Sequence, residues 1–126
     1  MLQIARALLL ATPERERRYD RPVVTVDSAR TMALELVDTV ESPHHGLPSF
    51  RVQGRIFATV PDATHLNVMI GEAGIRAMAA ARPADCAERW WGMRRAALTI
   101  DLELADAPFV REMLEEAWLY KRAGAW

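Results

Sequence analysis

The stretch from Ser49 to Val60 constrains the fold more than any other part of this sequence. Its two halves are rich in Phe, Val and Ile, which strands prefer, and the dipeptide Gln53-Gly54 separates them. Glycine at the second position of a two-residue turn supplies the positive φ that a tight hairpin needs. The stretch therefore predicts a β-hairpin that turns at Gln53-Gly54.

This turn also sets the cross-strand pairs of the hairpin. The expected pairs are Val52 with Arg55, Arg51 with Ile56, and Phe50 with Phe57. Neither face of the hairpin is then cleanly polar, so we expect both faces to be partly covered. Helices would cover one face. The N-terminal extension, the Trp90-Trp91 segment, a second subunit or a ligand could cover the other.

Apolar residues at i, i+3 and i+4 spacing predict three helices. The first begins after the N-cap Asp27-Ser28 and ends before Pro43, the second runs from Gly71 or Glu72 to about Ala81, and the third runs from the N-cap Asp106 to a stop at Gly124. On the outer side of the third helix, Arg111 and Glu115 are spaced for an ion pair.

Alternating residues predict strands after the hairpin. In residues 65–70, Leu66, Val68 and Ile70 point one way, and in residues 98–104 the side chains of Leu98, Ile100, Leu102 and Leu104 face the core. Trp90 and Trp91 suit a short strand before Gly92. Because the links between strands are short, we expect a mostly antiparallel sheet with the helices packed on one face. The fold class is a two-layer α+β domain over residues 23–126, preceded by residues 1–22 as a helical or poorly ordered N-terminal extension.

Composition excludes several classes of protein. The formal net charge of −1 gives no overall field toward nucleic acid or anionic lipid, and the single cysteine, Cys86, excludes an intrachain disulfide. No apolar run is long enough for a membrane span, and the run from Ala7 to Ala11 is too short for a secretory signal. We expect a cytoplasmic protein that does not bind membranes.

Three local patterns between Ser28 and Arg122 resemble one family. They are the segment from His45 to Ala58, the dipeptide Trp91-Gly92 followed by Leu98–Leu102, and the segment Leu114–Trp118. The first is similar to the block "hg-x-p-x-F-x-V-x-G-K-x-F-a" of the MmcQ/YjbR-like family of small bacterial proteins, with Arg55 in place of the usual lysine. The resemblance implies a CyaY-like α+β fold that has been compared with double-wing DNA-binding domains. It implies no catalytic residue.

One segment combines arginine with aromatic residues, as nucleic-acid surfaces do. The candidate contact residues for nucleic acid or a partner are Arg51, Arg55, Arg89, Trp90, Trp91, Arg94 and Arg95, with Arg76 and Arg82 as further neighbours. Between Arg51 and Arg95 there are seven arginines and four acidic residues, whereas residues 101–122 hold three basic and six acidic ones. The alternative is that both tryptophans pack on the core and the arginines are merely solvated.

No other pattern predicts chemistry. His44, His45 and His65 lack the spacing of a zinc site. Neither Cys86 nor Ser49 has an activating partner in sequence, so we predict no metal, no cofactor and no enzymatic activity. The start of the second helix, Gly71-Glu72-Ala73-Gly74, is too short and too generic for a phosphate loop.

Two functions therefore stay open. The first is a non-enzymatic binding domain with DNA as its partner. The alternative is a small-molecule or protein-partner binding module, either a monomer or a homodimer formed through the N-terminal segment. A continuous arginine surface on the sheet face opposite the helices would favour DNA, and an apolar cleft there would favour the alternative.

Overall fold

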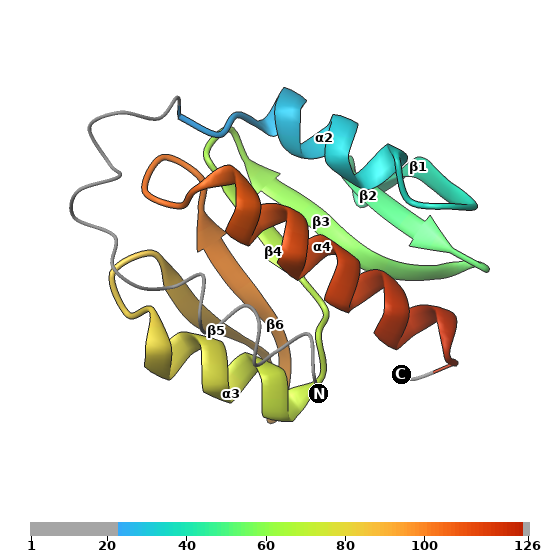
Figure 1. Cartoon of the computed structure of the whole chain (residues 1–126). Helices are drawn as coiled ribbons and strands as arrows, with labels where there is room; N and C mark the ends of the chain where they lie inside the picture. Colours follow the sequence, from blue (N-terminus) through green and yellow to red (C-terminus); the bar gives the residue numbers. More distant parts are fainter. Residues whose placement is uncertain (1–22, 125–126) are drawn as a thin grey trace.

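Six strands form one antiparallel sheet in the computed structural model, which describes residues 23–124. The elements in chain order are α2 (Val26–Leu34), β1 (Thr39–His44), β2 (Leu47–Val52), β3 (Arg55–Asp62), β4 (His65–Val68), α3 (Glu72–Ala81), β5 (Cys86–Trp91), β6 (Arg94–Asp101) and α4 (Ala107–Arg122). The strand order is β1-β2-β3-β4-β6-β5, and the three helices lie against one face of the sheet (Figure 1). The predicted two-layer α+β class is confirmed, whereas the predicted extension, residues 1–22, lies outside the described residues. Within residues 23–124, no helix is long and apolar enough to cross a membrane.

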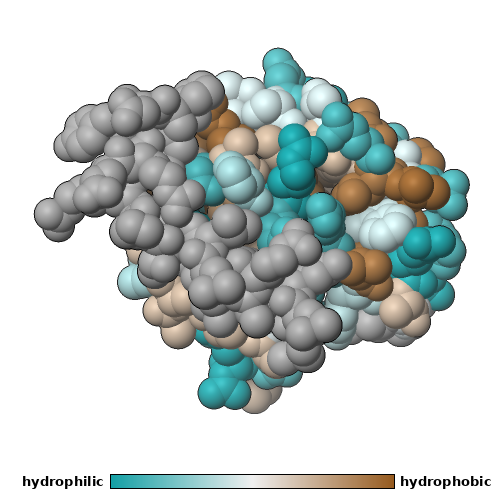
Figure 2. Space-filling model, in the orientation of Figure 1, coloured by the Kyte–Doolittle hydropathy of each residue, from teal (hydrophilic) through white to brown (hydrophobic). Residues whose placement is uncertain are grey.

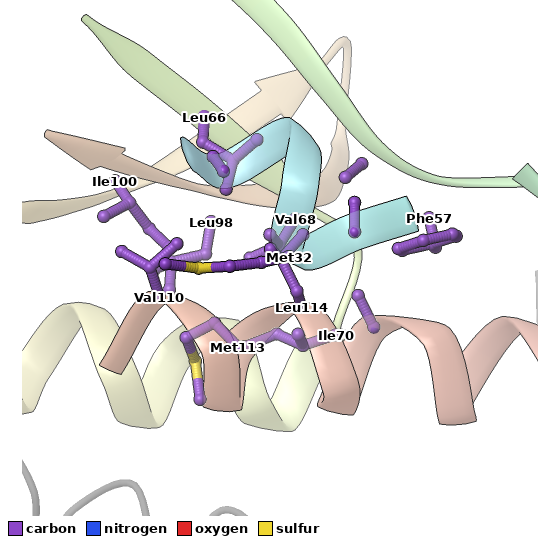
Figure 3. Close-up of a cluster of buried hydrophobic side chains, with 14 of the residues drawn as sticks. Met32, Phe57, Leu66, Val68, Ile70, Leu98, Ile100, Val110, Met113 and Leu114 are labelled. Carbon is purple, nitrogen blue, oxygen red and sulfur yellow. The ribbon is translucent and has the colours of Figure 1, made fainter. Parts of the chain in front are cut away.

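The hydrophobic core lies between the sheet and the helices. Every layer contributes to it, including Met32 of α2, Phe57 of β3 and Leu114 of α4 (Figure 3). The other core residues labelled in Figure 3 are Leu66, Val68, Ile70, Leu98, Ile100, Val110 and Met113. Burial of each large apolar side chain contributes about 1.5–3 kcal/mol, so this cluster holds the helices to the sheet.

The first helix is shorter than the sequence predicts. It ends at Leu34, Asp38 adopts a positive φ of 62°, and residues 39–44 form the edge strand β1 instead of a last helical turn. Val37 and Val40 have the spacing of a buried helical stripe, but both are exposed in the fold. In Figure 2, hydrophobic side chains lie at the right of the view, over the end of α2 and the start of β1.

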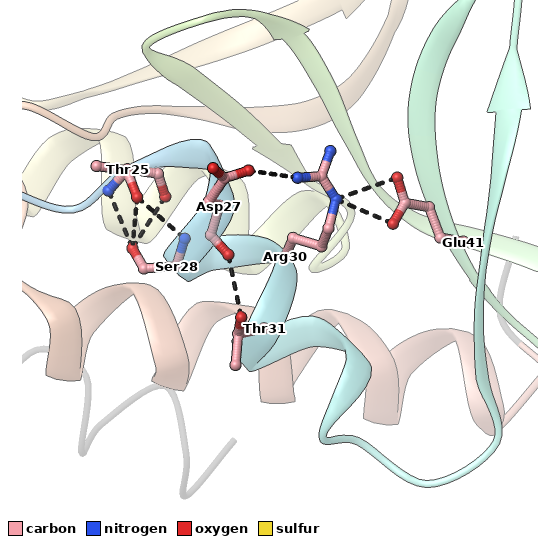
Figure 4. Close-up of polar contacts among 6 residues, drawn as sticks. All are labelled: Thr25, Asp27, Ser28, Arg30, Thr31 and Glu41. Carbon is pink, nitrogen blue, oxygen red and sulfur yellow. Dashed lines mark hydrogen bonds and ion pairs between the residues drawn. The ribbon is translucent and has the colours of Figure 1, made fainter.

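The N-terminus of α2 is capped two to three residues earlier than predicted. Thr25 is the N-cap: the Ser28 amide donates to Thr25 Oγ1 (3.0 Å), and the Thr25 amide donates to Ser28 Oγ (2.9 Å). Arg30 then joins the helix to β1, because its Nε lies 3.0 Å from Glu41 Oε1 (Figure 4). This reciprocal cap and the ion pair fix the start of α2 against the sheet.

The hairpin forms as predicted, with one exception. Gln53 (φ 51°) and Gly54 (φ 77°) make the two-residue turn, and Val52 pairs with Arg55. The register then shifts, so that Phe50 faces Ala58 and the expected pair with Phe57 is wrong. Simple alternation would place Phe57 and Ala58 on opposite faces of the sheet. The β-bulge brings both residues into the core.

The C-terminal elements differ in detail from the prediction. Asp106 caps α4 by accepting a hydrogen bond from the Phe109 amide (2.8 Å), as expected. However, β6 ends at Asp101, and Leu104 lies beyond it with 37% of its surface exposed. Arg111 pairs with Glu35 of α2 (2.9 Å) rather than with Glu115, because α2 packs alongside α4.

Candidate functional site

The sheet face opposite the helices, which we call the open face, is concave. Along the strands, residues that face the core alternate with residues that point to the open face. Thr59 of β3 and Asn67 of β4 belong to the second set. Two adjoining hollows of about 280 and 340 Å³ lie on it. His44 of β1 and Trp91 of β5 line both hollows, although these strands form opposite edges of the sheet. The sheet therefore curves enough for side chains of its two edges to approach one another.

A row of polar side chains crosses the floor of this face. The Asn67 amide donates to Thr59 Oγ1 (3.2 Å), and Thr99 Oγ1 donates to Asn67 Oδ1 (2.6 Å). These three residues are cross-strand neighbours in β3, β4 and β6. Because only 4% of Asn67 is exposed, its amide needs these partners, and the row holds the central strands in one register.

Five of the seven predicted contact residues line these hollows. Arg51, Arg55, Trp91 and Arg94 line the smaller hollow, and Arg89 lines the larger one together with Trp91. The Trp91 side chain does not pack in the core, since 46% of its surface is exposed. The side chains come from β2, β3, β5 and β6, so the fold brings together residues that are up to 43 positions apart (94 − 51).

The other two predicted residues lie on the opposite side of the sheet. Successive strand residues point to opposite faces, and Trp90 and Arg95 therefore face α3. Arg95 lies 2.6 Å from Glu72 and 3.2 Å from Glu88, and its guanidinium stacks 4.6 Å from the Trp90 ring centroid. The hydrogen bond from Trp90 and the contact with Arg95 hold the pKa of Glu88 below its ordinary value. These two residues form a separate charged cluster and do not line either hollow.

The two further neighbours suggested by the sequence lie away from the open face. Arg76 is exposed on α3, and Arg82 is buried against Asp85. Arg82 therefore cannot reach a ligand on the surface.

The open face has an excess of positive charge. Arg51, Arg89 and Arg94 form no ion pair with any carboxylate of residues 23–124, and no acidic residue of that range lines either hollow. The Nε of Arg51 is buried and has no hydrogen-bond partner among the residues that the structure describes. Buried polar groups are normally paired, so this arrangement favours an anionic ligand.

Sequence reasoning missed three residues of this site. Lys121 lines the smaller hollow from the last turn of α4, His44 lines both hollows from β1, and Asn67 of β4 lines the larger one. Lys121 stands out in the sequence as the only lysine of the chain. Its position near the end of a predicted helix does not indicate that it lies beside the sheet.

The residues considered for catalysis or metal binding do not assemble. Burial raises the pKa of the Cys86 thiol, and the charge of Asp85 raises it further. His65 hydrogen-bonds with Asp62 (2.9 Å), whereas His44 and His45 contact each other with their rings tilted by 60°. In the part of the chain that the structure describes, no three His, Cys, Asp or Glu side chains gather as metal ligands would.

Comparison with known structures supports the fold. A crystal structure of the Deinococcus radiodurans protein DR2400, which carries a DUF419 domain, has a similar fold with a TM-score of 0.69. That protein is 21% identical in sequence, and the match covers 84% of this chain and 85% of that one. None of the curated proteins matched the sequence.

The resemblance noted in the sequence is confirmed. The YjbR family model matches residues 34–120, which include both strands of the hairpin, the Trp91-Gly92 turn and most of α4. Since this range is well over half of the chain, the protein belongs to the YjbR family.

Proposed function

We propose that this protein is a non-enzymatic domain that binds single-stranded DNA across the open face of its sheet. The observation that carries the proposal is the concave surface on which Trp91 stays exposed and Arg51, Arg89 and Arg94 lack acidic partners within residues 23–124. Proteins that bind single strands combine a positively charged groove for the backbone with aromatic side chains on which bases stack.

The size of the hollows favours a single strand over a duplex. Volumes of about 280 and 340 Å³ are those of small-molecule pockets and accept individual nucleotides. A base stacked on Trp91 would contribute about 1–3 kcal/mol. Three phosphate contacts would give a slope of about −2 in a plot of log affinity against log salt concentration.

The test is a fluorescence anisotropy titration of a labelled oligothymidylate with a 5′-hydroxyl end at several salt concentrations. The double variant Arg89→Glu, Arg94→Glu should bind more than about tenfold more weakly, because two phosphate contacts become repulsive. The matched control Arg76→Glu, Arg111→Glu carries the same change in net charge on the helix side and should bind as the wild type does.

The two tryptophans provide a second matched pair. Trp91→Ala should weaken binding because it removes the stacking surface, whereas Trp90→Ala changes the opposite face and should not. Absence of binding at low salt, or equal losses in both members of either pair, would refute the proposal.

The alternative function, a small-molecule binding module, is favoured by one specific observation. Apolar and aromatic side chains of Leu47, Pro61 and Trp91 line the larger hollow, as in many ligand pockets. Dimerisation through the N-terminal segment, the other part of this alternative, concerns residues outside the described range. Light scattering of the full chain and of a variant lacking residues 1–22 would test it, and an unchanged mass would contradict it.

A further inference from the structure

A third hollow, of about 110 Å³, lies where α3 begins, β6 begins and α4 ends. Its lining residues are Met69, Gly71, Glu72, Arg94, Arg95, Ala96, Tyr120 and Lys121. Met69, Arg94, Ala96 and Lys121 also line the 280 Å³ hollow of the open face, so the two spaces adjoin. Lys121 stands between them.

Lys121 is a largely buried residue whose ammonium group has no carboxylate partner among residues 23–124. Only 6% of the residue is exposed, and among residues 23–124 its ammonium group makes no hydrogen bond or ion pair. The nearest aromatic ring is that of Tyr120, whose centroid lies 5.7 Å from Nζ. Burial lowers the pKa of Lys121, and the positive charges of Arg94 and Arg55 lower it further. The ammonium group is partly removed from water and repelled by two cations, so an anion in the adjoining hollow would stabilise its charged form.

The N-terminus of α3 adds hydrogen-bond donors to the same hollow. Gly71 is its N-cap and Glu72 its first residue, both line the hollow, and no side chain caps the helix. Its first amide groups are therefore left without a side-chain acceptor, and they lie at the positive end of the helix dipole. The Glu72 carboxylate, which could otherwise fill this position, is held by Arg95 at 2.6 Å.

Close packing of α4 on this helix start keeps the hollow small. Gly71 has a φ of 86°, and a Cβ there would lie 2.7 Å from Cε1 of Tyr120. Glycine thus lets Tyr120, and with it Lys121, approach the start of α3.

We propose that this hollow binds the phosphate group of a phosphomonoester, with Lys121, Arg94 and the start of α3 as its binding residues. A phosphate dianion would neutralise the Lys121 ammonium and accept hydrogen bonds from the uncapped helix. The organic part of the ligand would lie in the adjoining 280 Å³ hollow, against Ile56, Met69 and Trp91. A nucleoside monophosphate has both parts: a charged phosphate for the 110 Å³ hollow and a flat base for the 280 Å³ hollow. The phosphomonoester could be a free mononucleotide or the 5′-phosphorylated end of a DNA strand.

The single lysine makes a direct test possible. Protein labelled with 13Cε-lysine gives one lysine signal, that of Lys121, whose pKa can be followed by NMR. Adenosine 5′-monophosphate and inorganic phosphate, added at constant ionic strength, should shift this signal and raise the pKa of Lys121, and adenosine should not. The monophosphate should bind at least about tenfold more tightly than inorganic phosphate, since it also occupies the adjoining hollow.

A matched pair of variants separates a binding role from a structural one. Calorimetry should show that Lys121→Met weakens binding of adenosine 5′-monophosphate by more than about tenfold. Arg122→Met removes a neighbouring exposed cation, stacked 4.7 Å from the Trp118 ring centroid, and should leave binding unchanged. An unchanged pKa of Lys121 in the wild-type protein, or equal losses in the two variants, would overturn the proposal.

Two further titrations identify the source of the phosphate. If a 5′-phosphorylated tetranucleotide binds more tightly than the monophosphate, the site is assigned to the end of a DNA strand. If it binds equally or more weakly, the site is assigned to a free nucleotide. Both outcomes support the phosphate site. The proposal does not depend on binding of internal DNA segments, because oligonucleotides with a 5′-hydroxyl end test that activity separately.

Discussion

Arg82 and Asp85 form a two-point ion pair in the interior of the protein. Arg82 Nη2 lies 2.7 Å from Asp85 Oδ2, and Arg82 Nε lies 3.1 Å from Asp85 Oδ1. The same guanidinium lies 3.8 Å from the Phe109 ring centroid and 3.8 Å from Asp106 Oδ2. Asp106 is the N-cap of α4, so this pair links the loop after α3 to the start of the last helix.

Removal of Arg82 should therefore be strongly destabilising. Arg82→Met leaves the Asp85 carboxylate buried without its partner, and we expect a loss of about 3–5 kcal/mol in the free energy of unfolding, measured by urea denaturation. Arg111→Met, which breaks the exposed pair with Glu35, should cost less than about 1 kcal/mol. Similar losses in the two variants would show that the buried pair contributes no more than a surface one.

Two glycines with positive φ should differ in their tolerance of alanine. At Gly54 (φ 77°) a Cβ would meet nothing within 4 Å, so Gly54→Ala should cost only the backbone strain of about 1–2 kcal/mol. At Gly71 (φ 86°) the Cβ would also collide with the Tyr120 ring, so the loss should be larger. Denaturation curves of both variants check the order, and a smaller loss for Gly71→Ala would contradict the close packing of α3 and α4.

Lys121 should make stability depend on pH in the alkaline range. The pKa of Lys121 in the folded protein is lowered by burial and by the charges of Arg94 and Arg55, whereas in the unfolded chain it returns to its ordinary value of about 10.4. Between these two values the unfolded chain binds more protons, so the free energy of unfolding rises with pH. The advantage of Lys121→Met over the wild type should shrink as pH rises through this window. A difference that does not change with pH would mean that the ammonium is not penalised in the fold.

Cys86 should be unreactive in the native protein. It is buried, and burial together with the charge of Asp85 raises the pKa of its thiol, so little thiolate forms near neutral pH. We expect a thiol-specific disulfide reagent to react slowly with the folded chain and rapidly after denaturation. Rapid, complete labelling of the folded protein would show that the start of β5 opens readily.

Local chemistry explains which parts of the fold can be predicted from the sequence. The turn at Gln53-Gly54 and the cap at Asp106 depend on residues close in the chain, and both form as predicted. The end of α2 was predicted wrongly because Val37 and Val40 have helical spacing, although in the fold they lie on a turn and an edge strand. The bulge that moves Phe57 beside Ala58 depends on packing against the helices and leaves no local signal.

The candidate site shows the same division. Alternation along β5 separates Trp90 from Trp91, and alternation along β6 separates Arg94 from Arg95, but this division requires the pairing register of the two strands. The contribution of Lys121 could not be predicted, because only the packing of α4 across the sheet places its side chain beside Arg94.

The two edges of the sheet have a consequence for self-association. The outermost strand β1 contains Pro43, which has no amide proton to donate, and the charged residue Glu41, while the opposite edge strand β5 carries Glu88 and Arg89. Proline and charged side chains at such positions oppose the addition of a further strand from another molecule. Any dimer of this protein should therefore form through side-chain surfaces, without a sheet that continues from one subunit to the next.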